Sequence, residues 1–327
     1  MIDNKELKRL LICPYCQKGI IEQLNYFQCF SCRRKFFKKD YIDFIGEIKK
    51  TKENEKDLDV FLNFPELFKR KYEGARKLVA NFGNSYIRNA YIILIKNSKL
   101  DFNDKVILEI GGGLGELAEQ IKKMFPKTKY VFTDYVKNNI VEAIKSGKLE
   151  KIDPAITADI YKLPIKDESI DIIILSEILE HLDKLPLAMR EIKRVLKTGG
   201  IILASVPNSV MYFYPLPFLQ QILNPKKLMK RLKREENDND GGFYHRPFLP
   251  RQFRNLFKKD GYNVLKHNSM GLFFFHFPFN RLVKKYPNNY LIKLLVKILI
   301  SISDKIPFIN VPYLKFIGMR QIIIVRK

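Results

Sequence analysis

The 327-residue sequence has no tryptophan, only four cysteines, and far fewer acidic than basic side chains. So few cysteines exclude a disulfide-stapled scaffold, which a chain of this length does not need. No stretch approaches the roughly 20 apolar residues of a membrane-spanning helix, since the longest candidate, 291–303, contains Lys293 and Lys297. Residues 1–12 show no long apolar run and no small-residue cleavage site, so we expect no secretory signal and a cytoplasmic location.

The scarcity of acidic residues leaves a strongly basic protein. Lys and Arg number 59 against 35 Asp and Glu, a formal net charge of +24, and the sequence pI is about 9.7. Hydrophobic residues make up 46%, so the chain can bury a core. The charge predicts an anionic partner, which could be nucleic acid, a phospholipid surface or a phosphorylated substrate.

Composition divides the chain into a cysteine-bearing head (1–45), a charged and then helical lead-in (46–100) and a larger domain (101–327). The lead-in shows helical periodicity over 67–95. In the larger domain, short β-branched runs alternate with amphipathic stretches; the expected strands are 106–110, 130–133, 170–175 and 201–206, and the expected helices are 115–124, 136–144, 187–196 and 250–260. The alternation predicts an α/β fold, a doubly wound and mostly parallel sheet covered on both faces. An insertion at about 209–250 and a basic, aromatic part at 268–327 complete the domain.

The four cysteines form two CxxC pairs, Cys13 with Cys16 and Cys29 with Cys32, separated by twelve residues. Two such turns can direct four thiolates at one cation, which predicts a tetrahedral structural zinc site. Redox-active CxxC turns or unligated thiols are the alternatives. In so small a head the metal would stand in for a core, so chelation should unfold it locally.

The head also resembles a known module. Residues 11–19, the second cysteine pair and residues 41–45 are similar to the zinc ribbon of the methyltransferase-activator family, whose members bind and activate methyltransferases of RNA and translation factors. The family's usual proline between Ile42 and the following acid is missing. The resemblance implies an activator-like ribbon fused to the rest of the chain.

A glycine-rich turn follows the first strand of the larger domain. Residues 106–110 lead into Gly111, Gly113 and Gly115, and a helix opens directly afterwards. Such a turn brings backbone amides and a helix N-terminus close to a cofactor. The spacing Gly113-x-Gly115-x-x-Ala118 also satisfies the dinucleotide fingerprint, so glycine spacing alone leaves NAD open.

Two acidic residues flank this turn. Glu109 lies inside an apolar strand, where a carboxylate is costly to bury unless it has a cationic partner. Asp134 ends the next expected strand, 19 residues beyond Gly115, where a carboxylate can accept both hydroxyls of a ribose. Both acids suit a nucleoside cofactor, and the ribose role fits NAD and an adenosyl sulfonium equally.

The motifs that follow separate these cofactors. Five segments occur in order, at 158–160, 163–164, 169–176, 180–182 and 195–200. Over 106–208 the chain resembles class I S-adenosylmethionine-dependent methyltransferases, in the group related to the ubiquinone and menaquinone methyltransferases. The resemblance implies a Rossmann-like, seven-stranded sheet whose last strand, 321–325, is antiparallel.

The same resemblance implies roles for individual residues. Glu109, Gly111, Gly113 and Gly115 would serve the methionine end of the donor, Asp134 the ribose and Asp159 the adenine amino group; Ile160 would pack on the adenine, and Ser176 and Glu177 would line the donor pocket. As ordinary alternatives, Asp134 or Asp159 could cap a helix.

His181, beside Glu180, is our first candidate for a general base, and His245 is the second. Either histidine could instead only hydrogen-bond backbone. The Asn/Asp-Pro-Pro-Tyr/Phe motif of enzymes that methylate exocyclic base amines is missing after Leu175. If the four cysteines bind zinc, no thiolate remains to attack a pyrimidine ring.

The tail supplies a further pattern, because Asn289, Lys293, Lys297, Ser301 and Asp304 place one polar stripe on an apolar helix over 289–305. Such a helix either packs on the fold or lies at a membrane surface. We therefore expect a methyl acceptor on a small metabolite, lipid or cell-envelope glycan precursor, with tRNA, rRNA or a translation protein as the alternative. A cofactor-binding scaffold without turnover is the third hypothesis, and the oligomeric state stays open.

Overall fold

The computed structural model describes residues 4–46, 87–149, 154–209, 246, 248–270, 283, 285–305, 318 and 320–327. His245, nearly all of the insertion at 209–250 and the aromatic run 272–279 lie outside the described residues, as do residues 67–86 of the expected helix over 67–95. Residues 87–97 of that helix are helical. Within the described residues, no helix combines the length and apolar character needed to cross a bilayer.

The head folds as one short helix and four short strands. These are α1 (Asn4–Leu10), β1 (Ile20–Glu22), β2 (Tyr26–Cys29), β3 (Lys35–Lys38) and β4 (Ile42–Asp43). Each strand pairs antiparallel with the next. Elements this short bury little apolar surface by themselves, so the head depends on other contacts for its stability.

The larger domain alternates strands and helices. Its strands are β5 (Val106–Ile110), β6 (Lys129–Asp134), β7 (Ala155–Thr157), β8 (Ile170–Ser176), β9 (Leu196–Pro207), β10 (Asn263–Met270) and β11 (Arg320–Arg326). Its helices are α5 (Glu116–Met124), α6 (Lys137–Lys145), the 3-10 turn η1 (Leu179–His181), α7 (Leu185–Val195), α10 (Pro250–Lys259) and α12 (Tyr290–Lys305). The seven strands run in the order β7-β6-β5-β8-β9-β11-β10.

This order confirms the predicted architecture. Strands β7, β6, β5, β8 and β9 are parallel neighbours, and β11 is antiparallel to both β9 and β10, as the resemblance implied. Two strands had no sequence prediction: β7 has only three residues, and the polar residues of β10 hide its alternation. Both are recruited by pairing with stronger neighbours.

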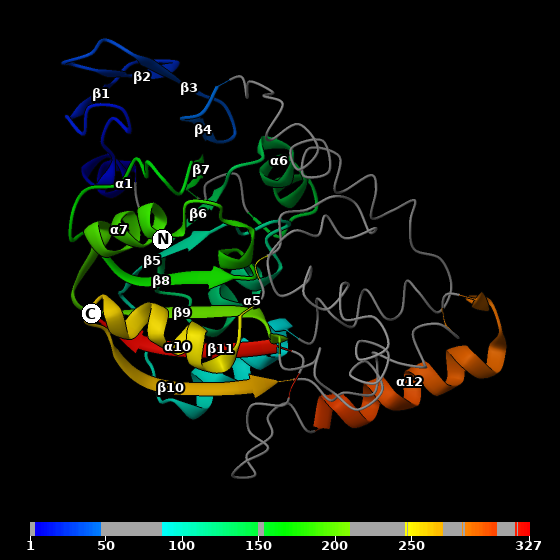
Figure 1. Ribbon diagram of the computed structural model, residues 1–327. Helices are drawn as coiled ribbons and strands as arrows, with labels where there is room; N and C mark the ends of the chain where they lie inside the picture. The colour runs from blue at the N-terminus through cyan, green and yellow to red at the C-terminus, as the bar shows by residue number, and fades with distance from the viewer. Residues whose placement is uncertain are drawn as a thin grey trace.

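Alternate residues of each strand face opposite sides of the sheet and build two cores. On one side, Leu108 and Ile173 pack with α7 and α10 through Ile192 and Phe253. On the other side, the sheet packs against α5, α6 and the helix at 87–97; the buried residues there include Ile107, Phe132, Ile174, Ile121, Ile140 and Tyr91. Helices thus cover both faces, as seen in Figure 1.

The head joins the larger sheet edge to edge. β4 pairs in parallel with β7, with Ile42 opposite Ile156 and Asp43 opposite Thr157, so that one eleven-stranded sheet runs through both parts (Figure 1). The Thr157 hydroxyl donates to Asp43 over 2.7 Å and accepts from the Phe44 amide over 2.9 Å. A second junction forms where the Ile12 amide donates to the Pro164 carbonyl. The head is therefore hydrogen-bonded to the segment that precedes β8.

Candidate functional site

The carboxyl end of β5 carries the glycine turn. Gly111, Gly113 and Gly115 all have positive φ, between 57° and 75°. A Cβ on Gly111 would be strained by its φ of 70° and would approach the tip of the Ile178 side chain to 2.2 Å, so the position favours glycine. At Gly113 a Cβ would meet none of the described residues within 4 Å, so they leave space open beside this backbone. The turn thus exposes backbone without side chains at the carboxyl ends of the strands, where α/β folds bind ligands.

Asp134, the last residue of β6, is hydrogen-bonded to the same turn. Its Oδ2 accepts from the Gly113 amide over 2.8 Å, and its Oδ1 accepts from the Val136 amide over 2.7 Å and from the Asn139 side chain over 3.2 Å. Burial raises the pKa of Asp134 to about 6, although these three donors oppose the shift. Asp134 does not cap α6, whose N-cap is Val136.

Glu109 lies directly behind the turn, in β5, and is 1% exposed. Burial raises the pKa of its carboxyl to about 8, and the nearby charge of Asp134 adds to the rise. The Tyr130 hydroxyl donates to Oε2 over 2.9 Å and partly stabilises the ionised form. A cation arriving at this end of the strand would favour that ionised form.

Asp159 and Ile160 follow β7, near the junction with the head. Ile160 is buried in the core that the two parts share. The Asp159 carboxylate accepts from the Tyr161 amide over 2.9 Å, and burial raises its pKa. Burial, followed by the charge of Asp159, raises the pKa of Tyr135, which is 39% exposed and lies directly after Asp134. These residues follow the carboxyl ends of β6 and β7, and β6 is the parallel neighbour of β5.

The end of β8 is held by charged and hydroxyl groups. Glu177 has a positive φ of 54°, which is strained for a residue with a side chain. Its carboxylate accepts from the Ser205 hydroxyl over 2.8 Å and pairs with Arg320 over 2.6 Å. The buried Tyr91 hydroxyl donates to the Leu175 carbonyl and interacts with Ser176. Glu177 is therefore already paired in this structure, whereas Ser176 stays half-buried at the strand end.

Glu180 and His181 lie in η1, immediately beyond this strand. Glu180 is 1% exposed, and its Oε2 has no hydrogen-bond partner among the described residues. Burial, followed by the charge of Glu177, raises the pKa of Glu180 well above the usual range. His181 is half-buried, with Nε2 3.8 Å from Glu180 Oε1. The pair lies in a single 3-10 turn, and the helix expected over 187–196 begins at Leu185 as α7.

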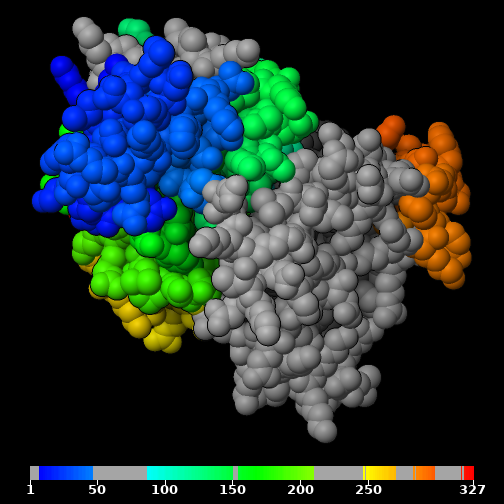
Figure 2. Space-filling view, turned by 90° about the horizontal axis from the view of Figure 1, so that it is seen from above, coloured from blue at the N-terminus to red at the C-terminus, as the bar shows by residue number. Residues whose placement is uncertain are grey.

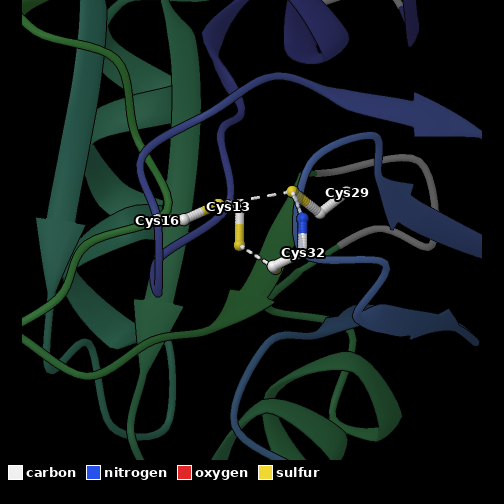
Figure 3. A group of neighbouring side chains, drawn as sticks. All are labelled: Cys13, Cys16, Cys29 and Cys32. Atoms are coloured by element: carbon white, nitrogen blue, oxygen red, sulfur yellow. Dashed lines mark hydrogen bonds between the residues drawn. The ribbon is translucent and has the colours of Figure 1, made fainter.

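The four cysteines converge in the head, as Figure 3 shows. Their sulfur atoms all lie within 4.8 Å of one another, with Cys13 to Cys32 at 3.6 Å and Cys16 to Cys29 at 3.4 Å. A tetrahedron with Zn–S bonds of about 2.3 Å has sulfur–sulfur edges of about 3.8 Å. The four thiols therefore fit one zinc ion.

The two cysteine turns share one backbone design. In each, the residue four positions after the first cysteine has a positive φ near 60° and donates its amide to that cysteine's carbonyl; these residues are Gln17 and Arg33. Burial raises the pKa of Cys13 to about 12, so metal binding there must displace a proton. Such matched turns fit the predicted zinc ligands better than a redox pair.

Sequence reasoning missed three tyrosines of this site. Tyr130 contacts Glu109, Tyr91 contacts the end of β8, and Tyr135 follows Asp134 directly. Of the three, only Tyr135 could have been found from the sequence, because it directly follows Asp134, the residue predicted to bind the ribose. The contacts of Tyr91 and Tyr130 arise from packing between elements far apart in sequence.

Comparisons with known proteins agree with the motifs. A family model described as a methyltransferase domain matches residues 108–204. The chain is 28% identical over 196 residues to an uncharacterized protein of Methanocaldococcus jannaschii, covering 59% of this chain and 70% of that one. It is 27% identical over 111 residues to a ubiquinone/menaquinone biosynthesis C-methyltransferase of Desulfotalea psychrophila, covering 33% of this chain and 45% of that enzyme. The chain thus spans under half the length of this named enzyme.

Among solved structures, a [4+2]-cyclase superimposes with a TM-score of 0.50 at 15% identity, covering 86% of this chain and 97% of the cyclase. That likeness shows the fold alone. The matched domain, the similar methyltransferases and the strand order confirm the resemblance drawn from the motifs: residues 108–204 are a domain of the S-adenosylmethionine-dependent methyltransferase family.

The buried Glu109 should make the stability of the ligand-free protein depend on pH. A folded-state pKa of about 8 means that its contribution is complete below the ordinary carboxyl pKa and is lost as pH rises through about 8. Between about pH 5 and pH 8 we expect the free energy of unfolding to fall by on the order of 3 kcal/mol. Urea unfolding across this range measures the change.

Two variants make this measurement specific. Glu109→Gln should make the decline smaller and leave the parts that the other acids whose pKa burial raises, Asp134, Asp159 and Glu180, supply. Glu119→Gln removes a carboxylate on α5 whose pKa is lowered, chiefly by the hydrogen bond from Lys123, so it should keep the decline. An unchanged pH profile in Glu109→Gln would mean that Glu109 is not the group responsible.

Removing the metal should affect the whole chain. Cys29 and Cys13 belong to the same buried core as Ile156 and Ile165 of the larger domain. We expect Cys29→Ser to abolish zinc binding, measured by plasma mass spectrometry, and to lower the calorimetric unfolding temperature by about 10 °C or more. Ser31→Ala, in the same turn, is the matched control. Loss of metal with an unchanged main transition would show two independent units.

Proposed function

We propose that this chain is an S-adenosylmethionine-dependent methyltransferase with a structural zinc ribbon fused at its N-terminal end. The observation that carries the proposal is the hydrogen bond between Asp134 and the Gly113 amide, with the buried Glu109 behind it. It places three features together: backbone without side chains at Gly113, a carboxylate at Asp134 that can accept ribose hydroxyls, and a buried carboxyl at Glu109 that can pair with a positive charge. The matched methyltransferase domain supports this reading over NAD.

The residues present fit such a donor. The described residues leave space beside Gly113 for a ligand against the backbone. Glu109 and Asp134 would offer carboxylates to an ammonium and to ribose hydroxyls. Asp159, Ile160 and the neighbouring Tyr135 would serve the adenine. When bound, the sulfonium supplies an electrophilic methyl group and a good leaving group, so the protein's main task is alignment. Ser176 would line the pocket, and Glu177 would act through its pairs with Ser205 and Arg320.

His181 is the proposed general base for an acceptor that carries a proton. It lies just beyond β8, with Nε2 3.8 Å from Oε1 of the buried Glu180. Because burial raises the pKa of Glu180, this carboxyl would stabilise a protonated imidazole only when it is itself ionised. His245, the second candidate, lies outside the described residues. An acceptor that is already nucleophilic would need neither histidine.

For the acceptor we propose an oxygen, nitrogen or carbon nucleophile on a small metabolite, a lipid or a cell-envelope glycan precursor. The methyltransferases similar to this domain include a malonyl-acyl-carrier-protein O-methyltransferase of Xylella fastidiosa and the C-methyltransferases of quinone biosynthesis. The residues that follow β8 lack the motif typical of exocyclic base amines. We propose a cytoplasmic location with peripheral membrane contact through residues 289–305.

A second candidate acceptor is tRNA, rRNA or a translation protein. The net charge of +24 favours it, and so does the ribbon's resemblance to activators of such enzymes. A binding scaffold without turnover is the third candidate, because Glu109 and Asp134 bear on binding rather than on the chemical step.

Donor binding tests the proposal directly. Asp134→Asn keeps the side-chain shape but removes the charge, so we expect affinity for S-adenosylhomocysteine to fall roughly 100-fold in calorimetry. Asp101→Asn, at an exposed turn before β5, is the matched control and should bind normally. Mass spectrometry of the purified protein should find the donor or its product. Bound NAD, or unaltered affinity in Asp134→Asn, would refute the assignment.

Ionic strength separates the two classes of acceptor. If RNA is the acceptor, its binding should weaken about 10³-fold or more between about 50 and 200 mM salt, as expected for a protein that makes many phosphate contacts. Turnover of a neutral small molecule should change little over the same range. Methyl transfer from labelled donor to cellular RNA and to small-molecule extracts, assayed side by side, gives the readout.

A further inference from the structure

Helix α12 presents an apolar stripe to solvent. The exposed fractions of its outward side chains are large: Tyr290 75%, Leu291 71%, Leu294 43%, Leu295 42% and Ile298 49%. These positions recur at i, i+1, i+4, i+5 and i+8, so they lie on one face of the helix. Figure 2 shows α12 at the edge of the molecule with its outer side uncovered in this view. An exposed apolar patch of this kind marks an interaction surface.

A different face holds the helix to the protein. Ile292 and Val296, one turn apart, are buried. The exposed stripe is therefore not the helix's attachment to the fold. Nor is the outer face the polar stripe expected from the sequence: Lys297 is exposed and Lys293 is half-buried, but both lie beside the apolar stripe. The side chains of Ser301 and Asp304 lie outside the described residues.

The charged residues that border the stripe over 285–297 are all basic, and the first acidic residue after them is Asp304, in the last turn of α12. Residues 261–303 contain Lys and Arg but no Asp or Glu. Lys293 and Lys297 form a row along the border of the stripe, and the exposed Lys285 lies just before the helix, over the Tyr286 ring at 5.2 Å. A basic border on an apolar helix face complements an anionic, apolar surface, because lysines reach headgroups while the stripe enters the acyl boundary.

We propose that the outer face of α12 docks on the surface of a lipid bilayer that contains anionic headgroups. The exposed Tyr286 and Tyr290, at the start of the helix, are of the type enriched at membrane interfaces. With 16 residues, α12 is shorter than the roughly 20 that a spanning helix needs, so it would lie along the surface. The proposal does not depend on the chemistry at the glycine turn.

Vesicle sedimentation of the full-length, zinc-loaded protein tests the proposal. We expect binding to vesicles of phosphatidylglycerol mixed with phosphatidylcholine and much weaker binding to phosphatidylcholine alone. Replacing Lys293 and Lys297 by Gln should weaken partitioning about fivefold for each lysine. Leu291→Asp combined with Ile298→Asp should weaken it by more than about tenfold.

Leu24→Asp is the matched control, because Leu24 is 89% exposed on the head, far from α12 in sequence. It should bind vesicles like the unchanged protein. Equal binding to neutral vesicles, or equal loss in Leu24→Asp, would contradict the proposal. So would a lipid-free oligomer that Leu291→Asp with Ile298→Asp converts to a monomer without any vesicle binding, which would make the stripe an interface between copies.

Failure of this proposal is distinguishable from failure of the proposed activity. Zinc content and S-adenosylhomocysteine affinity report on the head and the glycine turn, and the α12 variants should leave both unchanged. A protein that binds S-adenosylhomocysteine but no vesicle would refute only the proposal that α12 docks on a membrane. One that binds vesicles but no donor would refute only the methyltransferase assignment.

Discussion

The structure depends on parallel pairing of β5 and β6, which sets the carboxyl ends of the two strands side by side. That register lets the Asp134 carboxylate reach the Gly113 amide and places Glu109 behind the same turn. Both carboxylates are buried, and burial raises the pKa of each. Such acids are stable in ionised form only where backbone amides or a cation compensate them, which suits the positively charged nucleoside that we propose as the ligand.

The stability of the head depends on contacts other than its own hydrophobic core. Four short strands cannot bury enough surface to stand alone, and two contributions compensate for this: four thiols arranged to hold a metal, and the edge of the larger sheet. The pairing of β4 with β7 continues into the segment that carries Asp159 and Ile160. The ribbon thus shares a core with one wall of the proposed adenine site, although a charged segment of sequence separates the two.

Much of this arrangement could be predicted from local patterns. The strand at 106–110, the glycine turn and the helix after it follow from β-branched runs, glycine and helical periodicity, and the structure gives them nearly the same limits. The cysteine spacing predicted four converging thiols. β7 and β10 could not be found this way, because three residues or a polar run become strands only through a neighbour's hydrogen bonds. The partners of Glu177 and Glu109 were equally hidden, since Arg320 and Tyr130 meet them through tertiary packing.

The sequence by itself determined the chemistry that the chain can offer: paired thiols, backbone without side chains at a tight turn, acids at strand ends and a basic tail. These depend on residue type and spacing, which act over a few positions along the chain. Only the tertiary structure decided that the ribbon continues the sheet, that Glu177 is paired with Arg320, and that α12 turns an apolar stripe outward. Those outcomes depend on which residues become neighbours, and which stay exposed, when elements far apart in the sequence pack together. No local sequence pattern specifies these contacts.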